Sequence, residues 1–486
     1  MKKIVLPIMA AVCAAVSSAA ELKAGFARVD ITPPMGSFMP GYFKDRRAKE
    51  VLDPLQINCV AFSDGKAKAF VMQVDAEAVS DAVADRMRDA IVKSTGVDRN
   101  AILVHASHTH DGGYLAMHIG KDASGKPVYP KNATDVDRIY VDMCVTRAAD
   151  AAAAAIRDLA PATLSYQRSV AKRISFGRRY LMKDGKVRTN PGTGNPDIVR
   201  PAGTPPDETV QVLRIDRADA LPICVINFQC HPDVVGGETI TADWPGLTRT
   251  VFEAATMGGA HCMVINGTQG DVNHCNVMPR PGELNGLTRD FDAVDRGYSH
   301  SWHMANVIAA AALSVWIKCI PIEAGEIGFA TATVRVPAQK AKDTDEKNLA
   351  WAKEVCAKHD AGRDAERPWK EMELTTEVAR AARICRMANH PDYHDLPIYA
   401  VSIGKSLAFG GFPGEPFNDI GKAVKKASPF TLTILSCLTN GSRGYFPFSD
   451  SYVGGGYESA TSPFAPEVAD KLIEGQLGLL NSVRSK

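Results

Sequence analysis

The stretch Ala101-Ile-Leu-Val-His-Ala-Ser-His-Thr-His-Asp-Gly-Gly113 decides how the chain is organised. Its first four residues are apolar and predict a buried strand, which the two glycines end. If the strand continues through the histidines, its alternation puts Val104, His108 and His110 on one face. Two imidazoles at the end of a strand are a common source of two of the ligands of a metal site in an α/β protein. The alternative is that both are polar strand-end side chains bonded to the backbone.

The composition of the 486-residue chain is that of an ordinary globular protein. Apolar residues make up 45% of it and charged residues 23%, which is enough apolar material for a large core. The formal net charge of +1 does not indicate a basic surface that would bind nucleic acid or an acidic membrane. We therefore expect neither of these as a partner.

The first 20 residues have the pattern of an export signal. Lys2 and Lys3 precede an apolar run over residues 4–16, and small residues up to Ala20 offer a cleavage site. The apolar run is too short to span a membrane stably. We expect a mature chain of residues 21–486 that is periplasmic or secreted and has no integral membrane segment.

Ten of the eleven cysteines follow this cleavage site, and an oxidising compartment would permit disulfides between them. No Cys-x-x-Cys pair occurs among them. Alternation over the predicted strand 222–230 puts Cys224 and Cys230 on one face, too far apart to bridge each other. We expect mostly buried thiols, with Cys262–Cys275 as the candidate bridge.

Strand-like and helix-like runs alternate along the chain, which predicts an α/β fold. Strands are expected over 56–62, 68–74, 222–230 and 263–265, and helices over 81–94, 136–159 and 297–317. The charged segment 338–388 has helical spacing and predicts two exposed scaffold helices without chemistry. No linker divides the chain, so we expect a single large domain with mixed β-sheets flanked by helices.

Polar side chains also stand at the ends of other predicted elements. His231 ends the strand 222–230, and Glu415 lies just before a predicted helix, where the helix dipole favours a carboxylate. Taken singly, Glu415 is explained as a helix-start carboxylate, and Tyr445 and Tyr457 as packed or loop aromatic residues. Arg178, in turn, is explained as the partner of a surface acid.

Six motifs carry a resemblance to a known family. They are Val29-Asp-Ile-Thr-Pro-Pro34 with Gly41-Tyr42, His108-Thr-His110, Cys230-His-Pro232, Gly270-Asp-Val-Asn273, Pro413-Gly-Glu415 and the segment from Asn440 to Glu458. With them the chain resembles the catalytic domain of the neutral/alkaline, non-lysosomal ceramidases. Any one motif is weak evidence, whereas six in the family's order are specific.

The resemblance implies a catalytic Zn²⁺ held by four residues: His108, His231, Glu415 and Tyr445. Zinc accepts imidazole nitrogen and carboxylate or phenolate oxygen, and at an open position it lowers the pKa of water to about 7.

The resemblance also assigns residues to the substrate. It implies that His110 and Tyr457 contact the substrate head, together with an arginine for which Arg178 is the best match and Arg179 the alternative. His110 would donate to the oxyanion or protonate the leaving amine. Asp271 would orient a histidine ligand or hold its turn.

Two departures from the family bear on the substrate. The family has a serine at the position of Asn273, which is followed here by His274. Because an asparagine is not a nucleophile, we expect water to attack directly and Asn273 to assist by hydrogen bonding. The sequence also ends roughly thirty residues after the last motif, too few for the family's immunoglobulin-like C-terminal domain.

Together these features predict a zinc-dependent hydrolase that cleaves an amide bond by activated water. The expected substrate is an N-acyl sphingoid lipid or another N-acyl compound. The alternative is a hydrolase of the same fold acting on an acylated sugar or another polar glycan. A non-catalytic binding protein is the third hypothesis.

Overall fold

The computed structural model describes residues 21–42, 45–121, 127–130, 133–280, 297–340, 345–369 and 371–484. The export signal predicted over residues 1–20 lies outside this range and stays a prediction. Among the described residues, no helix has the length and apolar character needed to span a bilayer.

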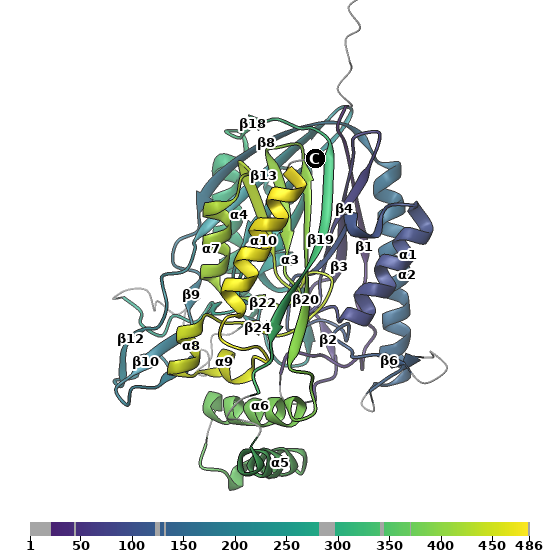
Figure 1. Ribbon diagram of the computed structural model, residues 1–486. Coiled ribbons are helices and arrows are strands. Elements are labelled where there is room, and N and C mark those ends of the chain that lie inside the picture. The colour runs from purple at the N-terminus through teal and green to yellow at the C-terminus, as the bar shows by residue number, and fades with distance from the viewer. Residues whose placement is uncertain are drawn as a thin grey trace, which may run out of the picture.

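A nine-stranded mixed sheet forms one half of the centre (Figure 1). Its strands lie in the order β16-β14-β13-β8-β1-β3-β4-β5, with β18 also paired to β8. Their bounds are β1 (Lys23–Asp30), β3 (Gln56–Ser63), β4 (Lys68–Val74), β5 (Ile102–Ala106), β8 (Ala160–Val170), β13 (Thr209–Arg217), β14 (Ala220–Phe228), β16 (His261–Asn266) and β18 (Ile320–Ile322). The pairs β4–β5 and β14–β16 are parallel and the others antiparallel.

A four-stranded sheet packs on the first and forms the other half of the centre. It consists of β19 (Ile327–Pro337), β20 (Tyr393–Ile403), β21 (Leu407–Gly411) and β23 (Leu432–Ser436), in this order. The rings of Phe62 and Phe409, one from each sheet, have their centroids 5.9 Å apart. Residues of both sheets therefore share one continuous apolar core.

Helices cover the outer faces of this pair of sheets (Figure 1). They are α1 (Asp81–Thr95), α2 (Asp135–Arg157), α3 (Asp243–Ala255), α4 (Tyr298–Trp316), α7 (Asn418–Ala427) and α10 (Val468–Arg484). The first four lie against the nine-stranded sheet, and α7 and α10 against the four-stranded sheet. This arrangement confirms the predicted α/β class with mixed sheets, and the described residues contain no immunoglobulin-like sandwich.

Short elements connect these layers. They are β2 (Glu50–Val51), β6 (Gly120–Lys121), β7 (Pro127–Val128), β9 (Phe176–Gly177), β10 (Arg179–Met182), β11 (Val187–Thr189), β12 (Ile198–Pro201), β15 (Thr239–Ile240), β17 (Val272–Asn273), β22 (Glu415–Pro416), β24 (Tyr445–Phe446), α8 (Ser449–Gly454), α9 (Tyr457–Thr461), η1 (Arg99–Ala101) and η2 (Asp364–Glu366). The helices α5 (Glu346–Asp360) and α6 (Glu371–Met387) lie side by side beyond one end of the sheets (Figure 1).

The alternation of β14 shows how the sequence sets these layers. Cys224, Ile226 and Phe228 pack in one apolar cluster with residues of α3 and α4, whereas Ile223 and Val225 point into the core shared by the two sheets. Both sets are fully buried, which explains why this strand is apolar on both faces.

The expected Cys262–Cys275 bridge is wrong, because none of the ten described cysteines forms a disulfide. Cys262 lies opposite Cys224 in the parallel pair β14–β16 and packs against α3 and α4. Cys275 packs instead in a separate small cluster with Tyr180 and Met182.

The edge of β5 is covered by a segment from the far end of the chain. Asn440 donates its backbone N–H to the Val104 carbonyl at 2.7 Å, and its side-chain oxygen accepts the Val104 N–H at 2.9 Å. Thr439 forms an antiparallel bridge with His105. The strand that leads to the histidines is therefore bonded on both sides.

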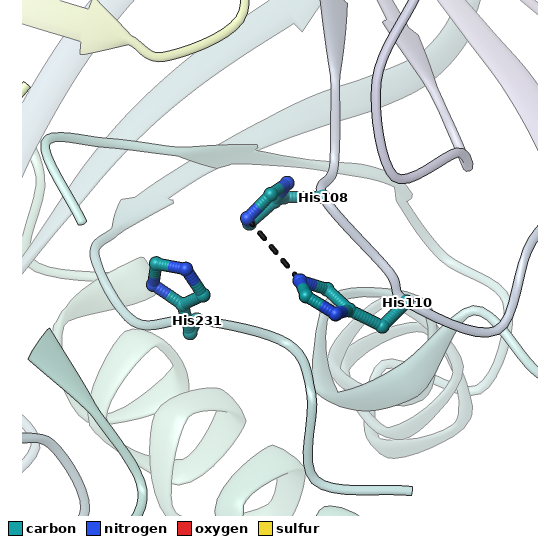
Figure 2. A group of neighbouring side chains, drawn as sticks. All are labelled: His108, His110 and His231. Carbon is teal, nitrogen blue, oxygen red and sulfur yellow. Dashed lines mark hydrogen bonds between the residues drawn. The ribbon is translucent and has the colours of Figure 1, made fainter. Parts of the chain in front are cut away.

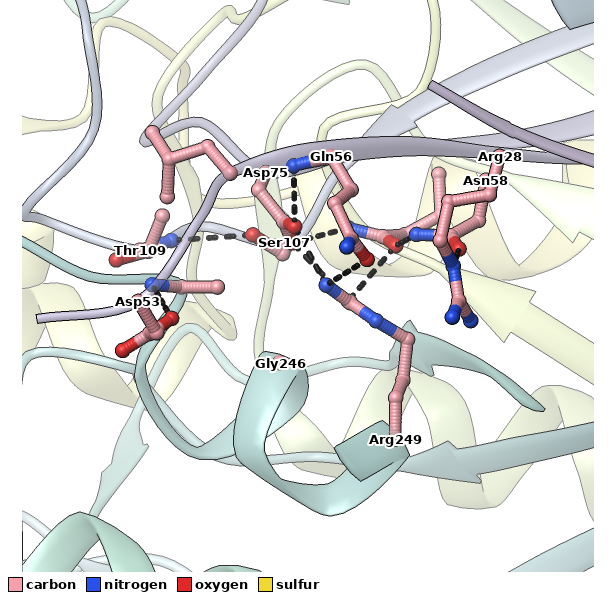
Figure 3. A network of polar contacts seen from close by, with 12 residues as sticks. Arg28, Asp53, Gln56, Asn58, Asp75, Ser107, Thr109, Gly246 and Arg249 are labelled. Carbon is pink, nitrogen blue, oxygen red and sulfur yellow. Dashed lines mark hydrogen bonds and ion pairs between the residues drawn. The ribbon is translucent and has the colours of Figure 1, made fainter. Parts of the chain in front are cut away.

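A buried polar network joins α3 to the strand ends of the nine-stranded sheet (Figure 3). Arg249 of α3 forms an ion pair with Asp75 at 2.6 Å, and both side chains are almost fully buried. Asp75 also accepts the backbone N–H of Gln56 and the side-chain amide of Gln73. This network fixes the end of β4, beside which the histidine segment begins.

Candidate metal centre

The histidine segment turns sharply at the end of β5. The strand ends at Ala106, and His108 has a left-handed backbone with φ of 75°. The predicted strand alternation through His110 is therefore wrong. The backbone N–H groups of Ser107 and His108 instead donate to the carbonyls of Val74 and Ala76, which ties this segment to the loop after β4. The turn, and not alternation, brings both imidazoles to one place.

Two histidines from different strand ends aim the same ring atom at the centre of the site. Nδ1 of His108 lies 2.7 Å from the Glu77 carbonyl, and Nδ1 of His231 lies 3.0 Å from the Gln269 carbonyl. A ring nitrogen that donates to a carbonyl leaves Nε2 as the site of the lone pair. Both Nε2 atoms therefore face inward, and each would offer its lone pair to a metal when the ring is neutral.

Glu415 and Tyr445 reach the site as a pair from the C-terminal part of the chain. They are directly opposite in the parallel bridge of β22 and β24. The Glu415 Oε2 atom lies 3.3 Å from Nε2 of His108 and 3.2 Å from Nε2 of His231. The Tyr445 hydroxyl lies 3.4 Å from Nε2 of His231. The four residues that the resemblance marks as ligands are thus brought together.

His110 completes the cluster (Figure 2). Its Nε2 lies 3.4 Å from Nε2 of His108, and no hydrogen-bond partner is present for its buried Nδ1 within the described structure. One ring nitrogen from each of His108, His110 and His231 lies within 4.8 Å of the others, so this group could hold a metal ion. Nitrogen and carboxylate oxygen donors of this kind suit a transition metal such as zinc.

The site holds opposite charges on buried side chains. Burial disfavours the imidazolium form of His108, but Glu415 and Glu77 together raise its pKa to about 9. Burial likewise opposes the charge of Glu415, yet His108 and His231 hold the pKa of this carboxylate well below its usual range. Burial and the neighbouring His108 lower the pKa of His110 well below its ordinary value, so His110 is neutral at pH 7. The buried Glu415 carboxylate is thus matched by positive charge on His108, at the place where a cation would bind.

Arg178 and Tyr457 lie beside this cluster, as the resemblance implies. Arg178 is buried and donates to Glu458 at 2.6 Å, and its guanidinium lies 5.4 Å from the centroid of the Tyr445 ring. The ring of Tyr457 also contacts Tyr445, with centroids 5.7 Å apart. The alternative arginine, Arg179, donates instead to Ser451 and to the Gly455 carbonyl. Of the two arginines, Arg178 is the one that faces the cluster.

Asp271 and Asn273 hold the turn behind the cluster. The Asp271 carboxylate accepts the backbone N–H of Asn418 at 2.7 Å, and burial raises its pKa to about 6. Asn273 donates its side-chain amide to Asn190 at 3.1 Å and accepts the backbone N–H of Cys275 at 3.0 Å. The described contacts do not connect either side chain to the three histidines.

A cavity of about 490 Å³ opens onto the cluster. His110, Arg178, His231, Tyr445 and Tyr457 line it, and so do residues that were not singled out from the sequence. Among these are Asp233, which directly follows the motif Cys230-His-Pro232, and Met372, Leu374, Thr375 and Val378 of α6. The expectation that α5 and α6 are only an exposed scaffold is therefore wrong, because α6 forms one wall of the cavity.

Comparisons with known proteins add evidence on the fold. No protein-family model matches the chain, and no curated protein matches it in sequence. Among solved structures, the neutral ceramidase from Pseudomonas aeruginosa superposes with a TM-score of 0.68 at 14% identity, over 96% of this chain and 75% of that chain. A ceramidase complexed with C2 gives a TM-score of 0.66 at 14% identity, over 96% and 76%. The chain thus has the fold of the neutral ceramidases, which confirms the fold expected from the resemblance.

Proposed function

We propose that the protein is a zinc-dependent hydrolase that cleaves the amide bond of an N-acyl lipid, with an N-acyl sphingoid as the first substrate to test. The observation that carries this proposal is the convergence of His108, His231, Glu415 and Tyr445 on a ceramidase fold, with His231 and Tyr445 also lining the cavity. When bound there, zinc supplies Lewis-acid polarisation of a carbonyl and makes water nucleophilic at neutral pH.

We assign the metal to those four residues and exclude His110 from the ligand set. His108 and His231 each have Nδ1 fixed by a backbone carbonyl, which is the usual arrangement behind a metal-binding imidazole. His110 has no such partner among the described residues, so its ring is less constrained.

The other residues of the cavity then act on the substrate. Neutral His110 takes up a proton from the attacking water and delivers it to the leaving nitrogen. Arg178, fixed by Glu458, presents its guanidinium to the carbonyl oxygen as negative charge develops there. Tyr457 lines the cavity beside Tyr445 and contacts the substrate.

Metal content and activity of matched variants test this assignment. The wild-type protein should carry about one zinc ion per chain by elemental analysis, and His231→Ala and Glu415→Ala should lose it while their far-UV circular dichroism stays unchanged. His110→Ala should retain zinc and lose amidase activity. The assignment would be contradicted if the wild-type protein held no zinc after incubation with the ion, or if His110→Ala failed to retain zinc.

A substrate screen tests the reaction class. Hydrolysis of ceramide and simpler N-acyl amines should exceed hydrolysis of acylated sugars. Acylated sugars serve as the comparison. Faster cleavage of these sugars would replace the proposed substrate class.

We further propose that the protein acts in the periplasm or outside the cell. The pattern of residues 1–20 supports this proposal. Cell fractionation and N-terminal sequencing should give a mature chain that begins after Ala20. An unprocessed chain in the cytoplasm would contradict it.

A further inference from the structure

Asp233 gives the cavity an acidic side that the proposed chemistry does not use. It follows His231-Pro232 directly and lines the cavity together with His110 and Arg178. The residue is buried, with 6% of its surface exposed. A buried carboxylate in a cavity requires a compensating partner, because desolvation of its charge is costly.

His274 holds this carboxylate in place. The Asp233 Oδ1 and His274 Nδ1 atoms are 3.4 Å apart, and His274 is also buried. His274 is the residue after Asn273, where the chain departs from the serine-containing turn of the ceramidases. Asn273 bonds to Asn190 and to the Cys275 N–H, which fixes the turn that carries His274. The pair Asp233–His274 is thus a built feature of the cavity wall.

The cavity therefore presents two opposite charges to its contents. Arg178 is a buried cation of the lining beside Tyr445, and Asp233 is a buried anion of the same lining. In hydrolysis of an amide, the oxygen of water bonds to the carbonyl carbon and the C–N bond breaks, and the nitrogen receives the proton. At neutral pH the products are a carboxylate and an ammonium ion. A cavity that is lined by the cation Arg178 and the anion Asp233 suits this pair of products.

We propose that Asp233 sets the orientation of the substrate in the cavity by binding the part of the substrate that carries the amide nitrogen. His274 is then the positioning residue for Asp233. This inference rests on the proposed amidase function. Asp233 accepts hydrogen bonds from the N–H and hydroxyl groups of the amino alcohol and then pairs with the ammonium ion that is released. The acyl carbonyl lies toward Arg178, so the wall at Asp233 selects substrates with a polar, hydrogen-bond-donating amine part.

Binding of the two product classes separates this role from a structural one. The probes are octylamine, octanoate and the neutral octanol, titrated calorimetrically into the zinc-loaded protein. Asp233→Asn should weaken octylamine binding by about tenfold or more, since a buried charge partner is lost, and leave octanoate and octanol within about twofold. His274→Gln should weaken octylamine binding less. Asp142→Asn is the matched control, because it removes a carboxylate from an exposed ion pair with Arg86.

The outcomes distinguish this inference from the proposed function. Equal weakening of all three probes in Asp233→Asn would indicate a damaged cavity and overturn the inference, and so would unchanged octylamine binding. If wild type hydrolyses no amide but loses octylamine selectively in Asp233→Asn, the amidase proposal fails and ammonium recognition stands. If wild type hydrolyses amides and the variant binds octylamine normally, only the role of Asp233 fails.

Discussion

Gly270 packs against the backbone of Glu415, and Gly270→Ala tests whether this contact sets the position of the Glu415 carboxylate. A Cβ at residue 270 would lie 2.5 Å from the Glu415 carbonyl oxygen and 3.0 Å from that of Pro416. Because Cβ contacts under 3.0 Å essentially do not occur, the two segments must separate by about 0.5 Å, a rigid displacement of backbone that costs about 1–3 kcal/mol. The Gly270 carbonyl also accepts from Arg178 at 2.8 Å, so the shift reaches the substrate side of the cavity as well.

For the proposed zinc site, we expect the zinc affinity of Gly270→Ala to fall by about 10- to 100-fold, the usual effect of disturbing the support of a metal ligand. Competition with a chromophoric chelator measures this affinity, and urea unfolding in the presence of EDTA measures the stability of the metal-free chain. Gly177→Ala is the control, because a Cβ there meets no atom within 4 Å. Wild-type zinc affinity in Gly270→Ala, or an equal loss in both variants, would refute the reasoning.

Two further predictions concern stability. Arg249→Met leaves the buried Asp75 carboxylate without the cation that lies 2.6 Å from it. Urea titration should therefore show that the free energy of unfolding falls by about 3–5 kcal/mol. A fall under about 1 kcal/mol would contradict a buried ion pair. Burial raises the pKa of Asp271 to about 6 from an ordinary value of 3.8, so between about pH 4 and pH 6 the folded chain holds a proton that the unfolded chain has released. Stability should therefore fall as pH rises through this window, and the fall should be smaller in Asp271→Asn; identical profiles would contradict the shift.

Residue periodicity predicted the two strands that lead to the histidines of the site. The apolar runs before His105 and His231 are strands, and the two histidine segments follow strand ends, as expected from their sequence. This worked because a strand buried on both faces has a strong local signature. Glu415 and Tyr445 were found only through the resemblance, since a two-residue bridge such as β22–β24 has no periodicity to detect.

Other features depend on contacts that no local pattern encodes. The left-handed turn at His108 carries no glycine, and backbone bonds to the loop after β4 impose it. The amphipathic pattern of α6 indicates that one face is covered, but not that Leu374 and Val378 of that face also line a cavity. The Cys262–Cys275 pairing failed for the same reason, because the two thiols belong to different apolar clusters.

The covering of β5 by Thr439 and Asn440 has a consequence for the biogenesis of the protein. The strand is synthesised early, whereas the segment that bonds its edge leaves the ribosome more than three hundred residues later. Until then β5 presents unpaired backbone groups and an apolar sequence, which is the kind of edge that recruits strands from other chains. A nascent or truncated chain that lacks residues 439–440 should therefore aggregate through β5 and depend on chaperones, even though every strand of its own sheet is present.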